Sequence, residues 1–314
     1  MNARLALRVR GLSAHIARPP APAWRRAGLA LAVLPALSGA LAPGAPLRSS
    51  AAGTRPAGTS TAGTSPAPPS PPPAVRYRPA GCRSHGFIAY RHGPARREVA
   101  LGFDDGPAAD TGAFVRMLER AHARASFFMI GRQIGPEYRP TLLRELADGD
   151  VLGDHTFSHP NLTASAEVRR QLLRTIVAIR ALTGYTPCVL RPPYGAYDAS
   201  VVRAARSLGL ATVLWNVDPA DWARPGSAAI ERRVLAQVRP GSIVISHDGG
   251  GPRGQTLAAY PAIIAALRAR GLRIVTIPEL LGFRPVYVPC IRLCYGIGVA
   301  RSAVPPDAVI ERAP

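Results

Sequence analysis

The stretch Val99-Ala-Leu-Gly-Phe-Asp-Asp-Gly-Pro107 indicates the architecture of this 314-residue chain. Val99–Phe103 is a short apolar run, and the carboxylates of Asp104 and Asp105 follow it directly. Apolar runs of this length predict buried strands. Barrels and open α/β sheets both place their active sites at the carboxyl ends of such strands. The paired acids therefore mark a candidate active site.

The region that follows alternates between strand and helix patterns. Further strands are predicted at Ala125–Ile130, Val151–Gly153, Cys188–Leu190, Ala211–Val217, Ser242–Ser246 and Arg273–Ile277. Helices are predicted at 110–122, 138–148, 165–182, 199–208, 227–238 and 256–270. This alternation predicts an α/β fold with a largely parallel sheet and helices packed outside it. About seven strands suit an incomplete (β/α) barrel, and a doubly wound open sheet is the competing architecture.

The amino-terminal part of the chain has a different composition. Residues 1–80 contain ten Arg and no acidic residue, and the whole chain lacks Lys. Basic, apolar and small residues follow one another in 1–47, which predicts a signal peptide or a retained N-terminal anchor. Residues 48–80 are rich in Pro, Ala, Ser and Thr and predict a disordered linker. We expect a catalytic domain at 81–285 and a short tail at 286–314.

The net charge of +20 limits the classes of partner. A nucleic-acid-binding surface would cluster basic residues with aromatic residues between them, and no such run is present in the sequence. An anionic cell surface suits the charge better. We therefore expect a secreted or cell-envelope protein, a monomer, that contacts the membrane only if its N-terminal segment is retained.

The chain has four cysteines, Cys82, Cys188, Cys290 and Cys294. If the protein is exported, these residues face an oxidising compartment. A zinc site at Cys290 and Cys294 would need further Cys or His nearby, and none follows. We expect a disulfide between Cys82 and the 290/294 pair, although the sequence leaves the pairing open, and we interpret Cys188 as a small buried residue.

A candidate metal site combines Asp105 with the histidines of His155-Thr-Phe-Ser-His159. Taken alone, the acids could form a turn and the histidines a surface pair. The four-residue spacing, however, puts both imidazoles on one side of a helical turn. One Asp and two His can hold zinc and leave a coordination position open for water. Asp104 could then take a proton from that water.

Arg191 and Tyr194 follow the fourth predicted strand, in Arg191-Pro-Pro-Tyr-Gly195. This segment could be a purely structural loop. Alternatively, the guanidinium pairs with a carboxylate such as Asp104 and keeps it ionised. The Tyr194 backbone N–H could then face an oxyanion.

His247 and Asp221 lie at two further strand ends. His247 could be an ordinary histidine, but its position suits a general acid whose pKa a carboxylate tunes, and Asp221 is the candidate partner. Trp222, beside Asp221, is a candidate groove wall that stacks on a sugar face.

Together, five motifs resemble those of polysaccharide deacetylases of carbohydrate esterase family 4, in the family's order and over about residues 97–280. They are Gly102-Phe-Asp-Asp-Gly-Pro107, His155-Thr-Phe-Ser-His159, Arg191-Pro-Pro-Tyr-Gly195, Asp218-Pro-Ala-Asp-Trp222 and Ile245-Ser-His247. Gly102 stands where Thr is common in the family, and Ile245 where Leu is common. Neither departure removes a catalytic group.

The resemblance implies a distorted (β/α) barrel with a bound Zn²⁺, or another divalent ion such as Co²⁺. It implies the following roles: metal ligands Asp105, His155 and His159; general base Asp104, oriented by Arg191; general acid His247, tuned by Asp221; and an acetyl pocket lined by Ile245 and Trp222.

The implied activity is removal of N-acetyl groups from the N-acetylhexosamine residues of a cell-wall glycan, with peptidoglycan as the expected substrate. Chitin or chitooligosaccharide is the alternative substrate, followed by another surface polysaccharide or acetylxylan. A catalytically inactive carbohydrate-binding protein on the same fold is the alternative of another class.

Overall fold

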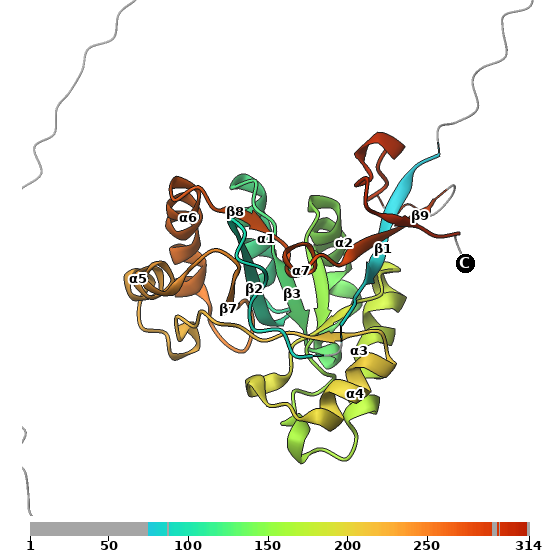
Figure 1. Ribbon diagram of the computed structural model, residues 1–314, viewed down its shortest axis with the longest axis horizontal. Helices are drawn as coiled ribbons and strands as arrows, with labels where there is room; N and C mark the ends of the chain where they lie inside the picture. The colour runs from blue at the N-terminus through green and yellow to red at the C-terminus, as the bar shows by residue number, and fades with distance from the viewer. Residues whose placement is uncertain (1–74, 87, 291–293, 295, 313–314) are drawn as a thin grey trace, which may run out of the picture. The chain divides into compact units, whose positions relative to one another are not determined.

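The computed structural model describes residues 75–86, 88–290, 294 and 296–312. Within them, seven parallel strands form a central sheet that the larger helices flank (Figure 1). The strands are β2 (Glu98–Gly106), β3 (Ser126–Met129), β4 (Val151–Asp154), β5 (Val189–Leu190), β6 (Ala211–Thr212), β7 (Ser242–His247) and β8 (Arg273–Val275). The helices are α1 (Thr111–Arg120), α2 (Arg139–Asp148), α3 (Val168–Thr183), α4 (Ala199–Ser207), α5 (Ser227–Gln237), α6 (Gly254–Ala269) and α7 (Ile277–Leu281).

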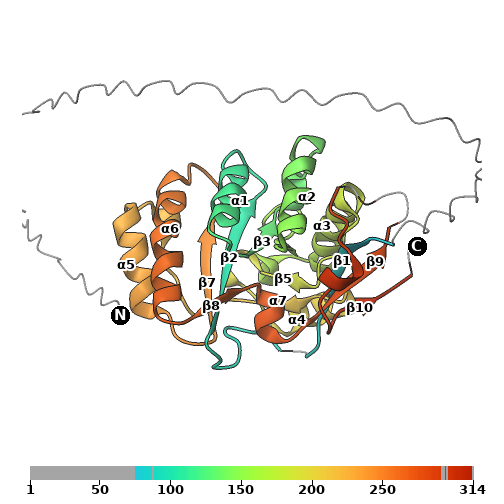
Figure 2. The same ribbon diagram turned by 90° about the horizontal axis from the view of Figure 1, so that it is seen from above.

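The sheet has the strand order β6-β5-β4-β3-β2-β7, and β8 pairs with the first half of β2. The segment after β6 lies beside β7, because Val217 forms a parallel bridge with Val244. Figure 2 shows the larger helices, α1 to α6, outside the strands. The predicted distorted, incomplete (β/α) barrel is therefore confirmed. The doubly wound alternative is wrong because β7 pairs with β2 on one side and bridges the segment after β6 on the other, so the sheet curls round on itself.

Alternation along β2 explains how the barrel positions its polar residues. Val99, Leu101 and Phe103 are fully buried in the same cluster as residues of the outer helices, and the Phe103 ring lies 4.7 Å from the ring of Tyr260 in α6. Successive strand residues face opposite sides of a sheet. The intervening residues, which end in Asp104, therefore face the inside of the barrel.

A second, three-stranded sheet joins the two ends of the described chain. It has the order β1 (Tyr77–Arg83), β9 (Arg284–Pro289) and β10 (Val309–Ile310), and β1 and β9 are antiparallel. A cavity of about 370 Å³ separates it from the start of β4 and is lined by residues of both. This sheet therefore lies at the amino ends of the barrel strands.

The small sheet extends the folded unit beyond the predicted limits of 81–285. β1 begins inside the predicted linker 48–80, and β9 continues into the predicted tail 286–314. The pairing of β1 with β9 is the physical reason, because each strand satisfies the backbone hydrogen bonds of the other. The division of the chain into separate functional parts stays a prediction.

The predicted signal peptide or anchor at 1–47 and residues 48–74 of the predicted linker lie outside the described residues. Among the residues that are described, no helix has both the length and the apolar character needed to cross a membrane.

The disulfide prediction is wrong. Cys82 pairs with Cys188, and Cys290 pairs with Cys294. The first pair forms because Gly81 of β1 bridges Thr186, just before β5, and this contact brings the neighbouring cysteines together. Cys188 is buried, as predicted, but as half of a disulfide.

Candidate active site

A cleft of about 500 Å³ opens at the carboxyl ends of the barrel strands. Eight of the ten predicted site residues line it, and the other two, Arg191 and Asp221, are buried behind its wall. The residues that line the cleft are Asp104, Asp105, His155, His159, Pro192, Tyr194, Trp215, Asp218, Trp222, Ile245 and His247.

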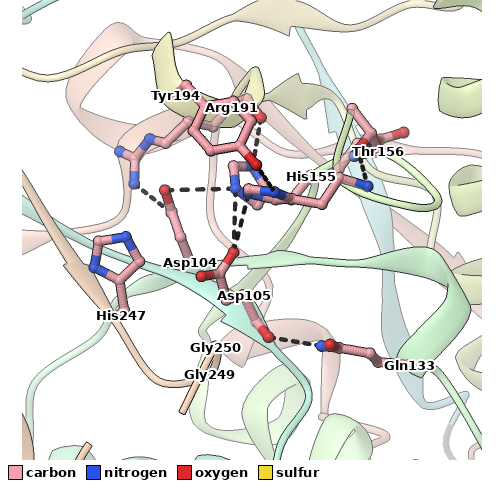
Figure 3. A network of polar contacts seen from close by, with 12 residues as sticks. Asp104, Asp105, Gln133, His155, Thr156, Arg191, Tyr194, His247, Gly249 and Gly250 are labelled. Carbon is pink, nitrogen blue, oxygen red and sulfur yellow. Dashed lines mark hydrogen bonds and ion pairs between the residues drawn. The ribbon is translucent and has the colours of Figure 1, made fainter. Parts of the chain in front are cut away.

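Asp105, His155 and His159 converge on one point. Figure 3 shows Asp105 facing His155. Asp105 Oδ1 lies 3.5 Å from His155 Nε2 and 3.3 Å from His159 Nε2. Asp105 follows the buried part of β2, and the two histidines come from the loop after β4. The sequence prediction that these residues lie together therefore agrees with the structure, but the predicted helical turn is wrong because Thr156 and His159 have positive φ angles in a loop.

Hydrogen bonds fix the orientation of both imidazoles. His155 Nδ1 lies 2.6 Å from the backbone oxygen of Arg191, which can only accept a hydrogen bond. His155 Nδ1 therefore carries the proton, and the lone pair of Nε2 faces Asp105. His159 Nδ1 lies 3.1 Å from the Tyr194 hydroxyl, so its Nε2 also faces Asp105.

The three side chains fit a divalent metal ion. Asp105 Oδ1 is buried and has no hydrogen-bond partner, although a carboxylate oxygen in that position needs a donor or a cation. Burial lowers the pKa of His155 to about 3, so its imidazole is neutral, as a metal ligand must be. Two imidazoles and one carboxylate are ligands that suit zinc and related transition metals.

The loops around this point have a strained backbone. Asp105, Thr156, His159 and Tyr194 have φ angles of +73°, +67°, +61° and +60°. Residues other than glycine rarely adopt positive φ, and such strain persists where the surroundings hold it in place. Three of these four residues, Asp105, His159 and Tyr194, line the cleft.

Asp104 is held by Arg191 inside the barrel. The guanidinium Nη1 of Arg191 donates to Asp104 Oδ1 over 2.7 Å, and its carbon lies 4.2 Å from the ring centre of Phe128. Burial raises the pKa of Asp104, and the positive charge of Arg191 opposes this rise. The second oxygen, Oδ2, lies 3.9 Å from His155 Nε2 and so faces the point where Asp105, His155 and His159 converge.

The room for Arg191 comes from Gly102, whose missing side chain leaves space on the inner side of β2. A Cβ atom at Gly102 would lie 2.6 Å from Arg191 Nη1.

His247 lies at the end of β7 and is held by Asp221. Asp221 Oδ1 accepts from His247 Nδ1 over 2.8 Å, and Oδ2 accepts from the His247 backbone N–H and from the Thr256 hydroxyl, each over 2.9 Å. Burial lowers the pKa of His247, but the hydrogen bond and the charge of Asp221 outweigh burial, so the pKa is raised overall. The geometry therefore favours a protonated imidazole in the cleft.

Two exposed aromatic residues flank the cleft. The side chains of Tyr194 and Trp222 are 71% and 60% exposed, whereas Ile245 is buried in the cleft floor. Exposed rings beside a polar cleft are suited to stack on sugar faces. The structure brings all ten predicted residues into or behind this cleft, and their individual roles stay predictions.

The sequence interpretation missed two glutamines that hold the metal-site loops. Gln171 of α3 accepts from the backbone N–H groups of Phe157 and Ser158 over 3.0 and 2.9 Å. Gln133 donates to the backbone oxygen of Asp105 over 2.7 Å. Both residues lie outside the five motifs, so only the fold reveals these contacts.

Comparisons with known proteins agree with this geometry. A family model described as polysaccharide deacetylase matches residues 91–213. A chitooligosaccharide deacetylase from Sinorhizobium fredii is 40% identical over 204 residues, which cover 60% of this chain and 94% of that protein. A peptidoglycan-N-acetylglucosamine deacetylase from Bacillus cereus is 34% identical over 206 residues, which cover 63% of this chain and 95% of that protein.

The fold is also similar to solved structures. The crystal structure of the Bc1960 peptidoglycan N-acetylglucosamine deacetylase matches with a TM-score of 0.59 and 33% identity, over 62% of this chain and 92% of that chain. The extent of these similarities, which span nearly the whole length of the relatives, shows that the chain belongs to the polysaccharide deacetylase family, carbohydrate esterase family 4.

Proposed function

We propose that this protein is a metal-dependent hydrolase that removes N-acetyl groups from the N-acetylhexosamine residues of peptidoglycan. One observation carries the proposal. A metal-ligand set, a buried carboxylate held by Arg191 and a histidine held by Asp221 all face one cleft. Hydrolysis of an amide needs an activated water, a base and an acid, and these three groups are suited to supply them.

Asp105, His155 and His159 would hold the ion. A divalent ion bound there would polarise the acetamide carbonyl and lower the pKa of water. Zn²⁺ suits the two imidazoles and the carboxylate, and Co²⁺ is an alternative with the same ligand preferences.

The remaining residues of the cleft would move protons and bind the sugar. Asp104, kept in place by Arg191, takes a proton from the attacking water through its free Oδ2. His247 gives a proton to the nitrogen of the departing glucosamine, and acetate is released. The Tyr194 backbone N–H would stabilise the oxyanion. Trp222 and Ile245 would enclose the acetyl group.

Two observations bear on the substrate. A peptidoglycan deacetylase is similar over 95% of its length, and the charge of +20 suits an anionic cell wall. Chitooligosaccharide is the second candidate, because a chitooligosaccharide deacetylase is similar over 94% of its length with the higher identity of 40%.

We also propose that the protein acts outside the cytoplasm. Two disulfides among the described residues support this location, because disulfides persist in oxidising compartments. The signal-like composition of residues 1–47 supports it as well.

Substitution of a metal ligand tests the reaction. His155→Ala should abolish both zinc binding, measured by calorimetry, and acetate release from chitin oligomers. His122→Ala is the matched control, since His122 is exposed and lies outside the cleft, and it should change neither. Acetate release that survives the loss of His155 would contradict the proposed mechanism.

A substrate comparison separates the candidates. The zinc-loaded protein is incubated with purified peptidoglycan and with chitin oligomers, and the products are read by mass spectrometry. Loss of acetyl from peptidoglycan in preference to chitin oligomers supports the proposal, and the reverse preference supports chitooligosaccharide. No acetate from either glycan, with binding retained, supports the inactive carbohydrate-binding protein.

A further inference from the structure

A glycine loop after β7 packs against the metal-ligand carboxylate. Gly249 leaves no room for a side chain, because a Cβ there would lie 2.0 Å from the backbone oxygen of Asp105. Gly250 has a φ of +71°, and a Cβ there would lie 2.4 Å from Asp105 Oδ2. Figure 3 shows both glycines with Asp105. The position of this loop therefore determines where the Asp105 carboxylate can lie.

Arg253 binds the backbone of this loop through its guanidinium group. Its Nε donates to the backbone oxygen of Gly249, and its Nη2 donates to that of Gly250 over 3.1 Å. Its own backbone N–H donates to Asp110 Oδ2 over 2.7 Å, which fixes the start of α6. The side chain is 5% exposed. A buried guanidinium with these contacts clamps two consecutive carbonyl groups.

The charge of Arg253 also faces Asp105. Asp105 Oδ2 and Arg253 Nη2 lie 2.4 and 3.1 Å from the place where a Gly250 Cβ would be, so the two atoms are neighbours across the loop. No ion pair within 4.0 Å joins Arg253 to a carboxylate of the described chain. Asp105 Oδ2 is therefore a carboxylate oxygen that lies beside this buried guanidinium across the glycine loop.

We propose that Arg253 is a positioning residue for the metal site, an inference that rests on the proposed function. Its clamp on the Gly249–Gly250 carbonyls holds the loop against Asp105. Its positive charge attracts Oδ2 toward the loop. Oδ1 is thereby left free to face both histidines, which is the arrangement in which the carboxylate can bind one ion together with them. Groups that orient metal ligands in this way typically contribute a factor of about 10–100 to metal affinity.

Metal affinity tests the proposal directly. Zn²⁺ and Co²⁺ are titrated into the metal-free full-length protein by calorimetry at 25 °C. Arg253→Gln, which removes the charge and most of the clamp, should weaken binding of both ions about 10- to 100-fold. Arg253→Lys, which keeps the charge but can reach only one carbonyl, should bind more tightly than Arg253→Gln. At saturating metal, kcat should recover and KM for chitin oligomers should stay unchanged.

Arg268→Gln is the matched control. Arg268 lies at the other end of α6 and also donates to two backbone carbonyls, those of Ala121 and His122. Its substitution should leave metal affinity unchanged. If Arg253→Gln does not fold, Gly250→Ala replaces it, because a methyl group there displaces the Asp105 carboxylate and should weaken metal binding by a similar factor.

The outcomes separate this inference from the proposed function. Metal affinity within twofold of the wild type in Arg253→Gln overturns the role of Arg253 and leaves the hydrolase intact. The same result in Gly250→Ala overturns the premise that the loop position determines where the Asp105 carboxylate lies. A lower melting temperature without a change in affinity shows a merely structural role and also overturns it. No metal binding by the wild type overturns the proposed function and this inference together.

Discussion

At the scale of single residues, Arg191 contacts both a histidine of the candidate metal site and the candidate base. Its backbone oxygen accepts from His155, one of the metal-site imidazoles, while its guanidinium donates to Asp104, the candidate base. The side chain is fully buried. A displacement of Arg191 therefore moves the candidate base and a candidate metal ligand at the same time.

Arg191→Lys should lower kcat/KM although it keeps the charge. The guanidinium reaches Asp104 over 2.7 Å and the Leu214 backbone oxygen over 3.4 Å, and a single ammonium cannot reproduce this fork. A hydrogen bond to a charged group contributes about 1.5–3 kcal/mol, so we expect a loss of at least about tenfold. Steady-state kinetics measure it, with exposed Arg120→Lys as the control. Unchanged kinetics in Arg191→Lys would exclude the orienting role.

Asp221→Asn should shift the pH dependence of the reaction. The carboxylate of Asp221 raises the pKa of His247, which must be protonated to act as an acid. Activity is therefore present below this raised pKa and is lost as the pH rises through it. Without the charge the pKa falls, so the alkaline limb of the kcat profile should move to lower pH.

The control for this shift is Asp218→Asn. Asp218 lines the same cleft, but its side chain accepts from the backbone of Ala220. The alkaline limb of the kcat profile of Asp218→Asn should stay at the wild-type pH. An equal shift in both variants would mean that the change reflects the net charge of the cleft and not the pairing of Asp221 with His247.

At the scale of elements, α3 supports the metal-site loop. Gln171 projects from this helix and accepts from two consecutive backbone N–H groups, those of Phe157 and Ser158. These residues lie between the two histidines. The spacing of the imidazoles is thus held by a helix that contributes no ligand.

Gln171→Ala should weaken metal binding without unfolding the helix. Ala is the best helix former, so α3 should persist, whereas the loop loses its two acceptor contacts. We expect about tenfold weaker zinc affinity by calorimetry, which is the lower part of the range for groups that orient ligands. Arg169→Ala, an exposed change on the same helix, should have no effect. Equal affinities of the two variants would show that the loop holds its own shape.

The elements that the sequence predicts well are those with a local pattern. The strands β2, β3 and β7 and the helices α1 to α6 lie within a few residues of their predicted limits, because burial imposes a periodicity on each. β6 is shorter than the predicted Ala211–Val217. Beyond its end the backbone of Leu214 donates to Tyr90 and that of Val217 to Ile243, so the segment leaves its neighbour β5.

The parts that could not be predicted depend on distant contacts. β1 and β9 pair although about 200 residues separate them, and neither carries a distinctive pattern. The motif residues of the cleft were predictable because each follows a strand. Gln133, Gln171 and Arg253 were not, because their partners are backbone groups that only the folded chain brings near.

At the scale of the whole molecule, the two disulfides constrain very different lengths of chain. Cys82–Cys188 joins residues 106 positions apart, whereas Cys290–Cys294 joins residues four positions apart. A cross-link stabilises mainly by restricting the unfolded chain, and the effect grows with the length of the closed loop.

Removal of the long-range disulfide should therefore cost more stability. We expect Cys82→Ser/Cys188→Ser to lower the free energy of unfolding by about 5 kcal/mol, and Cys290→Ser/Cys294→Ser by about 2 kcal/mol. Urea denaturation under oxidising conditions measures both, and each double variant serves as the control for the other. A larger loss in the second variant would contradict the loop-length argument.

The small sheet of β1, β9 and β10 lies at the amino ends of the barrel strands, and the cleft opens at their carboxyl ends. The described chain thus enters and leaves on the side away from the sugar. A bead or carrier coupled at the first or last described residues therefore leaves the cleft open, so bulky insoluble polymers can still reach it after immobilisation.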